Sequence, residues 1–344
     1  MRDHVIRSVN KAYALLVEAP PVVPDHLLPK TGMARIVWAH PPQQHPWFYR
    51  DERIFDSPQR DFFGFYVLAR ATRATLIGAR YLQAGDVLLA GDYCAAAVVA
   101  YYTAALNLTL AYLALEGRVF IDFPHGPPVP DAKGGEPMWS EIRDKGGQRR
   151  SMLAKLSKRG LWNFEAKPCG HDSRWQELLP LLDELRREKP PSSLPDPFWG
   201  LLGYCTTYGN DYLGGKDGCD DAERDLLEEG IKAIPEIRHE AVYRGYGYDD
   251  LAVDAAFAGE SSASGFNRKP HAFRLFGAAM VEQVADDVWR CVDGVDPTHW
   301  VALFSATSQA ALLPEYELPS ITRDSTESTW QRVDQLMMAF KVAR

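Results

Sequence analysis

The twenty-three residues from Tyr93 to Leu115 (YCAAAVVAYYTAALNLTLAYLAL) include no charged side chain. A helix that is apolar on every side is covered either by lipid or by protein, and this length is enough to cross a bilayer. The content favours protein: the stretch is rich in alanine, contains Asn107, and would place tyrosines near the hydrocarbon midplane. Lys and Arg are also not concentrated on one flank, as a membrane orientation signal requires. We therefore predict a buried bundle helix over residues 92–116 and no association with a membrane.

A second helix is expected just before this one. From Asp61 onward the apolar side chains recur at helical spacing, and Asp61 itself is suited to cap the first turn. Gly85 or Gly91 marks a turn between the two helices, and Gly117 is placed to end the second helix as a C-cap residue. Two helices joined by a short turn predict the start of an antiparallel bundle.

Other stretches also have helical patterns; they cover residues 2–18, 173–189, 216–247, 271–292 and 328–344. Pro180 should kink the helix over 173–189, and Pro235 should lie in the first turn of the second of two short helices within 216–247. No alternating strand pattern of useful length is found. We predict a mostly α fold, an antiparallel helical bundle with long proline-rich loops and flanking helices. The expected parts are an N-terminal helix and irregular arm over 1–60, the bundle over 61–258 and a C-terminal helical extension over 270–344.

Composition limits the compartment and the class of ligand. The chain has five cysteines, an odd number, with no C-x-x-C pair, and its N-terminal residues lack the uninterrupted apolar run of a secretory signal. These features favour a reducing cytoplasm. The cysteine spacing matches no zinc-ligand pattern, so we expect no metal and no cofactor. A net charge of -8 excludes a generally basic, DNA-coating surface, so any nucleic-acid contact must be local.

Arginine and lysine gather in one part of the chain. Between Arg143 and Arg159, seven basic residues stand against a single acid, Asp144. The residues that we expect to contact phosphates, from within three turns of a helix, are Arg149, Arg150, Lys155, Lys158 and Arg159. The alternative is a solvated surface with no ligand.

A second candidate site is EIRHEAVYRGYGYDDL, residues 236 to 251. Arg238 and His239 are expected near the N-terminus of a short helix, and Tyr243, four residues after His239, should share its face. Arginine stabilises phosphate charge and histidine moves protons near neutral pH, so these side chains could position a phosphodiester. The alternative is structural: Arg238 and His239 would hydrogen-bond to the preceding loop, and the tyrosines would cap the core. The motifs G-x-S-x-G, Walker A, G-x-G-x-x-G and H-E-x-x-H are absent.

The pair formed by DYCAAAVVAYYTAALNLTLAYLALEG and EIRHEAVYRGYGYDDL resembles the HEPN families, over roughly residues 85–257. In those families a tyrosine- and alanine-rich helix is followed later by a helix that carries arginine, a polar residue and then histidine. By this resemblance, Arg238 matches the arginine, His239 the polar position, and Tyr243 stands where the active families have histidine. The resemblance implies a homodimer with its cleft across the two-fold axis.

The tyrosine at position 243 matters for activity, because a phenol is a poor base near neutral pH. We therefore expect an RNA- or nucleotide-binding protein with weak or no ribonuclease activity, in a toxin–antitoxin or defence context and with a possible protein partner. Tyr243→His is the change expected to raise cleavage. The alternative function is a non-enzymatic helical scaffold or partner-binding subunit, and salt-dependent RNA binding separates the two hypotheses.

Overall fold

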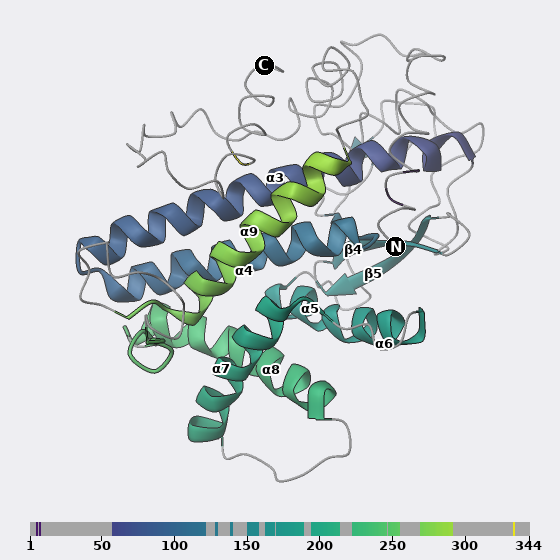
Figure 1. The fold of residues 1–344 in the computed structure, drawn as a ribbon. Coiled ribbons are helices and arrows are strands. Elements are labelled where there is room, and N and C mark those ends of the chain that lie inside the picture. Colours follow the sequence, from purple (N-terminus) through teal and green to yellow (C-terminus); the bar gives the residue numbers. More distant parts are fainter. Residues whose placement is uncertain are drawn as a thin grey trace. The chain divides into compact units, whose positions relative to one another are not determined.

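The computed structural model describes residues 57–121, 128–129, 138–139, 150–157, 162–168, 170–188, 194–213, 222–245, 247–254 and 269–291, together with Val5, Arg7 and Val333. The described part is mostly helical, which confirms the predicted fold class (Figure 1). The chain divides into two compact units. Unit 1 contains Met1–Ala74, Leu110–Cys169 and Val284–Arg344, and unit 2 contains Thr75–Thr109 and Gly170–Gln283.

The first two long helices of the described chain are α3 (Ser57–Ala90) and α4 (Cys94–Leu115). The turn between them falls at Gly91, one of the two predicted positions, while α3 begins four residues before Asp61, the predicted cap. Gly117 has a φ of 80° and its N–H donates to the carbonyl of Ala114, so the predicted C-cap is confirmed. Positive φ is the conformation that glycine adopts without strain.

Within unit 2, α3 and α4 approach closely because glycines on α3 face large side chains on α4. A Cβ added to Gly85 would lie 2.4 Å from a ring carbon of Tyr101, and one added to Gly78 would lie 2.6 Å from Leu108. The opposite order of these partners along the two helices shows that the helices run antiparallel.

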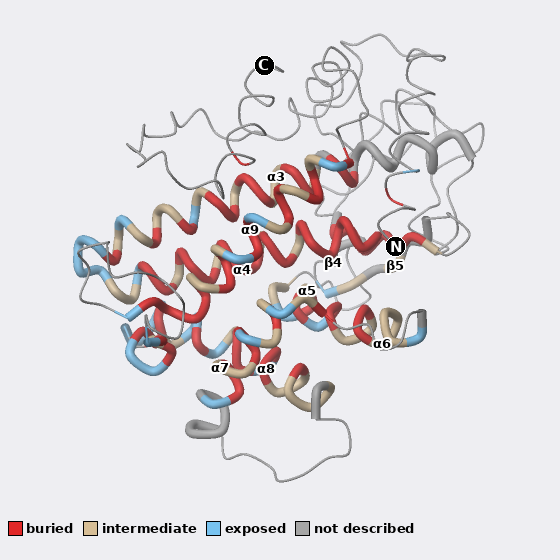
Figure 2. Tube along the Cα trace, viewed as in Figure 1, coloured by how far each residue is buried: buried red, intermediate tan, exposed pale blue. Residues whose placement is uncertain are grey.

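Helix α4 is long and apolar enough to cross a membrane by length and composition. However, 78% of its most apolar 18-residue window is buried inside the protein, and Figure 2 shows the helix buried along most of its length. This burial agrees with the prediction of a core helix.

Unit 1 contains a three-stranded antiparallel sheet, which the sequence did not predict. Its strands are β1 (Arg118–Ile121), β4 (Arg150–Leu156) and β5 (Trp162–Pro168), in the order β1-β4-β5. Two further short strands, β2 (Pro128–Val129) and β3 (Met138–Trp139), pair with each other. The sequence WNFEAKP of β5 does alternate apolar and polar residues, but the run is short, and pairing with a distant strand stabilises it.

In unit 2, α5 (His171–Gln176) and α6 (Leu178–Glu188) replace the single kinked helix predicted over 173–189. The break comes at Glu177 and not at Pro180. Pro180 has no N–H and its ring crowds the preceding turn, so it is accommodated in the first turn of a new helix.

Helices α7 (Asp196–Leu213) and α8 (Ala222–Tyr243) pack against each other, with Gly230 of α8 against Leu202 of α7. The prediction of two short helices is wrong, because Pro235 lies inside the continuous helix α8. Apolar residues on both sides of the proline, including Ile231 and Ile237, are buried. Burial of this apolar stripe favours the continuous helix and outweighs the loss of the one backbone hydrogen bond that the proline removes.

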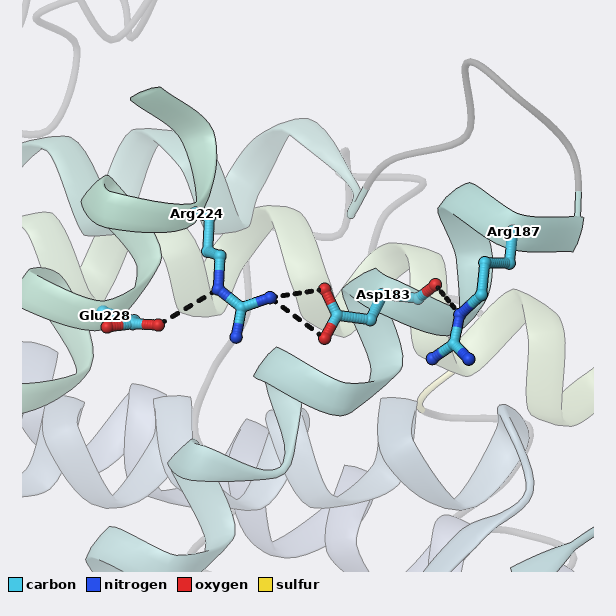
Figure 3. A network of polar contacts seen from close by, with 4 residues as sticks. All are labelled: Asp183, Arg187, Arg224 and Glu228. Atoms are coloured by element: carbon cyan, nitrogen blue, oxygen red, sulfur yellow. Dashed lines mark hydrogen bonds and ion pairs between the residues drawn. The ribbon is translucent and has the colours of Figure 1, made fainter. Parts of the chain in front are cut away.

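Polar contacts tie α8 to α6 (Figure 3). One guanidinium nitrogen of Arg224 on α8 lies 3.0 and 3.1 Å from the two carboxylate oxygens of Asp183 on α6. Arg224 also donates to Glu228, one turn along α8, at 3.2 Å, and Arg187 donates to the backbone carbonyl of Asp183. The network fixes how the first half of α8 lies on α6.

Helix α9 (Ala272–Arg290) confirms the helix predicted over 271–292. In unit 2 its Phe276 packs against the rings of Phe198 and Trp175, at centroid distances of 5.0 and 6.4 Å. The predicted N-terminal helix and arm, and the helix over 328–344, lie outside the described residues, except that Val5, Arg7 and Val333 are helical.

Candidate functional site

Arg238, His239 and Tyr243 lie in the last two turns of α8, and not near a helix N-terminus as predicted. The prediction was wrong because α8 starts thirteen residues before Pro235, at Ala222. All three side chains are exposed, and Tyr243, at 74%, is the most exposed of the large apolar and aromatic residues that the structure describes. Two glycines with positive φ, Gly245 and Gly247, follow the helix end.

The three side chains do not open on one common side of α8. The rings of His239 and Tyr243 lie 4.6 Å apart, which confirms that these two residues share a face. Arg238 is five residues before Tyr243, so the two side chains leave the helix about 140° apart. The neighbours of Arg238 are therefore different from those of Tyr243.

One such neighbour is on α4. The guanidinium carbon of Arg238 lies 5.6 Å from the ring centroid of Tyr102, a cation–π distance. Among the residues that the structure describes, none gives Arg238 a hydrogen bond or an ion pair. The structural alternative, in which Arg238 hydrogen-bonds to the preceding loop, is not observed in this part of the chain. Arg238 is thus exposed, with its guanidinium over the ring of Tyr102.

Tyr102 is fully buried and held in place by its hydroxyl and its ring. The hydroxyl lies 3.0 Å from Nδ1 of His171, the first residue of α5, and the ring meets Phe273 edge-on at 5.7 Å. Burial raises the pKa of Tyr102 to about 12, although the indole of Trp175 and the charge of Arg238 act to lower it. The phenol is therefore neutral over the ordinary pH range.

The polar surroundings of Tyr102 come from α5 and α8. The charges of Asp172 and Arg174 on α5 affect the pKa of its hydroxyl, as does the charge of Arg238. The site thus contains two arginines, one aspartate and one histidine around a buried phenol. We call it the Tyr102 cluster, made of Tyr102, His171, Asp172, Arg174, Trp175 and Arg238.

The sequence did not reveal the Tyr102 cluster, because Tyr102 and His171 are 69 residues apart and no motif links them. Tyr102 was predicted only as part of an apolar helix. A usable signal was its position beside Tyr101 in a helix without charges, since a buried phenol hydroxyl needs a polar partner from elsewhere in the chain.

A second buried histidine fixes the turn that follows α8. Nε2 of His271 donates to the carbonyl of Gly247 at 2.9 Å, and the N–H of Phe273 donates to Nδ1 at 3.2 Å. Burial lowers the pKa of His271 to about 4. Tyr248 is buried and donates from its hydroxyl to the carbonyl of Lys269. The end of α8 is therefore anchored to the residues that precede α9.

Residues 150–156 of the basic segment form the strand β4 and not a helix, so the predicted spacing over three helical turns is wrong there. Arg150 and Lys155 belong to β4, and Lys155 pairs with Glu165 on β5 at 2.9 Å. Lys167 binds the same oxygen of Glu165 at 2.6 Å. Burial acts to raise the pKa of Glu165, but the hydrogen bonds from Lys167 and Lys155 outweigh it and hold this pKa below its usual value.

The remaining members of the predicted phosphate-contacting set, Arg149, Lys158 and Arg159, lie outside the described residues, as does the side chain of Arg150. In the described part of the segment, the charge of Lys155 is thus committed to an ion pair on the neighbouring strand.

Within the described residues, no group of three or more His, Cys, Asp and Glu side chains is arranged to hold a metal ion. Cys205 is buried, and burial raises the pKa of its thiol far above the usual value. No protein-family model, no curated protein and no solved structure matches this chain. Its function must therefore be argued from its own residues.

Proposed function

We propose that this protein binds RNA or a nucleotide through a phosphate group at Arg238, as a HEPN-like helical protein with weak or no ribonuclease activity. The observation that carries the proposal is the state of Arg238: exposed, without a hydrogen bond or ion pair to any described residue, and supported by the buried ring of Tyr102. A guanidinium offers planar donors that match phosphate oxygens. Support from an aromatic face reduces the freedom that the side chain loses on binding.

The expected chemistry is binding without efficient cleavage. Cleavage of RNA needs a group that removes the 2′ proton near neutral pH, and a phenol does this poorly. On α8 the two exposed rings, His239 and Tyr243, are together on a different side of the helix from Arg238.

A titration of labelled single-stranded RNA, followed by fluorescence anisotropy at several salt concentrations, tests the proposal. We expect wild-type affinity to fall with salt, with a slope of about -0.7 for each phosphate contact. Arg238→Ala should weaken binding and flatten the slope. The matched control is Arg244→Ala, because Arg244 is exposed on the same helix but is ion-paired with Glu240 at 3.0 Å. Equal binding by the two variants would contradict the proposal.

We also propose a homodimer in the cytoplasm, with a possible protein partner and a toxin–antitoxin or defence role, as the HEPN resemblance implies. Light scattering at micromolar concentration tests the assembly: a monomer mass would count against the dimer and against any cleft composed of two copies.

The alternative function, a non-enzymatic helical scaffold, is favoured by one observation in unit 1. Both Lys155 and Lys167 are paired with Glu165, which reduces the positive charge available to a nucleic acid there. The scaffold hypothesis predicts no salt-dependent RNA binding by wild type in the same titration.

A further inference from the structure

We propose that the phosphate site extends from Arg238 across Tyr102 to His171 on α5. In this proposal His171 is the residue of the site that gains a proton as pH falls through neutrality. The inference rests on the proposed function for its ligand, a phosphodiester, and adds a residue to it. In this view the histidine that acts together with Arg238 comes from another helix and is neither His239 nor a substitute at position 243.

The geometry that supports the inference is the shared contact with Tyr102. Arg238 lies over the ring at 5.6 Å, and His171 lies at the hydroxyl at 3.0 Å. Helix α5 packs against α8, so the two side chains come from neighbouring elements. Because Tyr102 is fully buried and also contacts Phe273, its ring cannot turn away, and it acts as a fixed spacer between the arginine and the histidine.

The hydrogen bond of His171 allows it to change protonation state. A hydroxyl can donate to Nδ1 of a neutral imidazole and can accept from Nδ1–H of an imidazolium, so the bond between Tyr102 and His171 is compatible with both forms. His271 is the opposite case, because Nδ1 accepts from the N–H of Phe273, which cannot accept in return. The bond with Tyr102 therefore permits a change of charge at His171, and the bond from Phe273 opposes one at His271.

The charges around Tyr102 make this change useful for binding an anion. The charged groups that act on its hydroxyl are Arg238 and Arg174, which are positive, and Asp172, which is negative. Protonation of His171 adds one positive charge beside these groups. By linkage, a phosphate that binds more tightly to the protonated site also favours protonation, so affinity should rise as pH falls through neutrality.

The other histidine near Arg238 in sequence is less well placed. His239 is adjacent to Arg238 on α8, so their side chains leave the helix about 100° apart. Its ring contacts Tyr243, 4.6 Å away, on the exposed side of the helix. His239 therefore provides a matched control on the same protein.

The test is the pH dependence of RNA affinity between pH 8 and pH 5.5, at fixed ionic strength and without divalent metals. The probe is a single-stranded RNA with hydroxyl groups at both ends, because a phosphodiester does not titrate in this range whereas a terminal phosphate does. Its label must keep a constant charge over the range. Wild-type affinity should rise about threefold to tenfold as pH falls, the effect of one added charge near the phosphate.

His171→Gln, which keeps a side chain able to bond to the Tyr102 hydroxyl, should abolish the pH dependence, and His239→Gln should leave it unchanged. Tyr102→Phe, which keeps the ring under Arg238 and removes the hydroxyl, should shift the midpoint of the profile. Circular dichroism at each pH checks that every variant is folded. If His171→Gln does not fold, an unchanged profile in Tyr102→Phe overturns the inference.

The outcomes separate the two proposals. Binding that depends on Arg238 but has a flat pH profile, or a profile that His239→Gln abolishes, overturns the role of His171 and leaves the proposed function standing. Failure of wild type to bind RNA at every pH overturns the proposed function and, with it, this inference.

Discussion

The imidazole of His271 is buried and donates from Nε2 to the carbonyl of Gly247, the second of two glycines that follow α8. The N–H of Phe273 donates to the other ring nitrogen, so this pair of bonds selects the neutral form with its proton on Nε2. An imidazolium in the same place would set Nδ1–H against the N–H of Phe273. Burial and this bonding disfavour protonation of His271, so acid should destabilise the turn that follows α8.

The stability of the folded protein should therefore depend on pH through His271. Burial lowers its folded-state pKa from 6.5 to about 4, so the folded protein binds fewer protons than the unfolded chain between these values. The stabilisation is fully present above about pH 6.5 and is lost as pH falls toward 4. Between pH 7 and pH 5 the histidine alone should remove about 2 kcal/mol of unfolding free energy.

Urea unfolding of wild type and His271→Gln at pH 7 and pH 5 measures this loss. Glutamine does not titrate, and it can donate to Gly247 and accept from Phe273. The wild type should lose more stability than the variant between the two pH values. An equal loss in both proteins would show that other groups cause the acid sensitivity.

A second prediction concerns Tyr101, which is buried on α4 and donates to a carboxylate oxygen of Asp86 at 2.8 Å. Arg274 donates to the same oxygen at 2.7 Å. Burial and the nearby carboxylate raise the pKa of Tyr101, so the phenol remains a donor at any ordinary pH. Tyr101→Phe should lower the free energy of unfolding by about 1–2 kcal/mol, because a bond to a charged group is lost.

The matched control for that change is Tyr81→Phe, since Tyr81 is on α3 and 42% exposed. Its hydroxyl has water as an alternative partner, so this change should have little effect. The comparison is made from urea midpoints at pH 7. Equal midpoints for the two variants would mean that the bond between Tyr101 and Asp86 does not stabilise the fold.

A third prediction follows from the close approach of α7 and α8. A Cβ at Gly230 would lie 2.7 Å from a methyl carbon of Leu202 and 3.2 Å from its Cα, so Gly230→Ala should cost about 1–3 kcal/mol of stability through overpacking. Gly200, on α7, has no neighbouring atom within 4 Å of a built Cβ. Gly200→Ala should therefore stabilise by up to about 1 kcal/mol, the helix preference for alanine. Thermal unfolding that ranks the two variants in the opposite order would contradict this packing.

Local chemistry was enough to predict several elements of the fold. The turn at Gly91, the C-cap at Gly117 and the helix that became α9 depend on neighbours in sequence, and the structure confirms them. Pro235 was misjudged because its local cost is outweighed by the burial of residues that come from α8 as a whole. The strands of unit 1 were missed because their stability comes from pairing with distant segments.

The candidate site, too, was predicted from the sequence only in part. The shared face of His239 and Tyr243 is a matter of helical spacing and was predicted. The contact of Arg238 with Tyr102, and that of Tyr102 with His171, depend on how three helices pack. No pattern within one helix contains that information, so the partner of Arg238 could be found only in the folded protein.

The last prediction concerns ribonuclease activity and the position where an added histidine would act. By the HEPN resemblance, Tyr243→His should raise cleavage. Helix geometry argues against it, because residue 243 leaves α8 about 140° away from Arg238. Val242 is four residues after Arg238, on the same side of the helix, and is 44% exposed. Val242→His should therefore place an imidazole beside the arginine, where general acid–base catalysis typically contributes about 100-fold to 10,000-fold.

Labelled RNA incubated without metal ions tests this with wild type, Tyr243→His, Val242→His and the double variant Val242→His with Arg238→Ala. We expect cleavage to be very low in the first two, measurable in Val242→His, and lost again in the double variant, because the arginine must hold the phosphate beside the new imidazole. Cleavage by Tyr243→His that requires Arg238 would show that both side chains reach one ligand and would restore the site expected from the resemblance. Cleavage by wild type that persists in Arg238→Ala would point to a contaminant or to a site elsewhere in the chain, because the proposed site depends on that guanidinium to hold the phosphate.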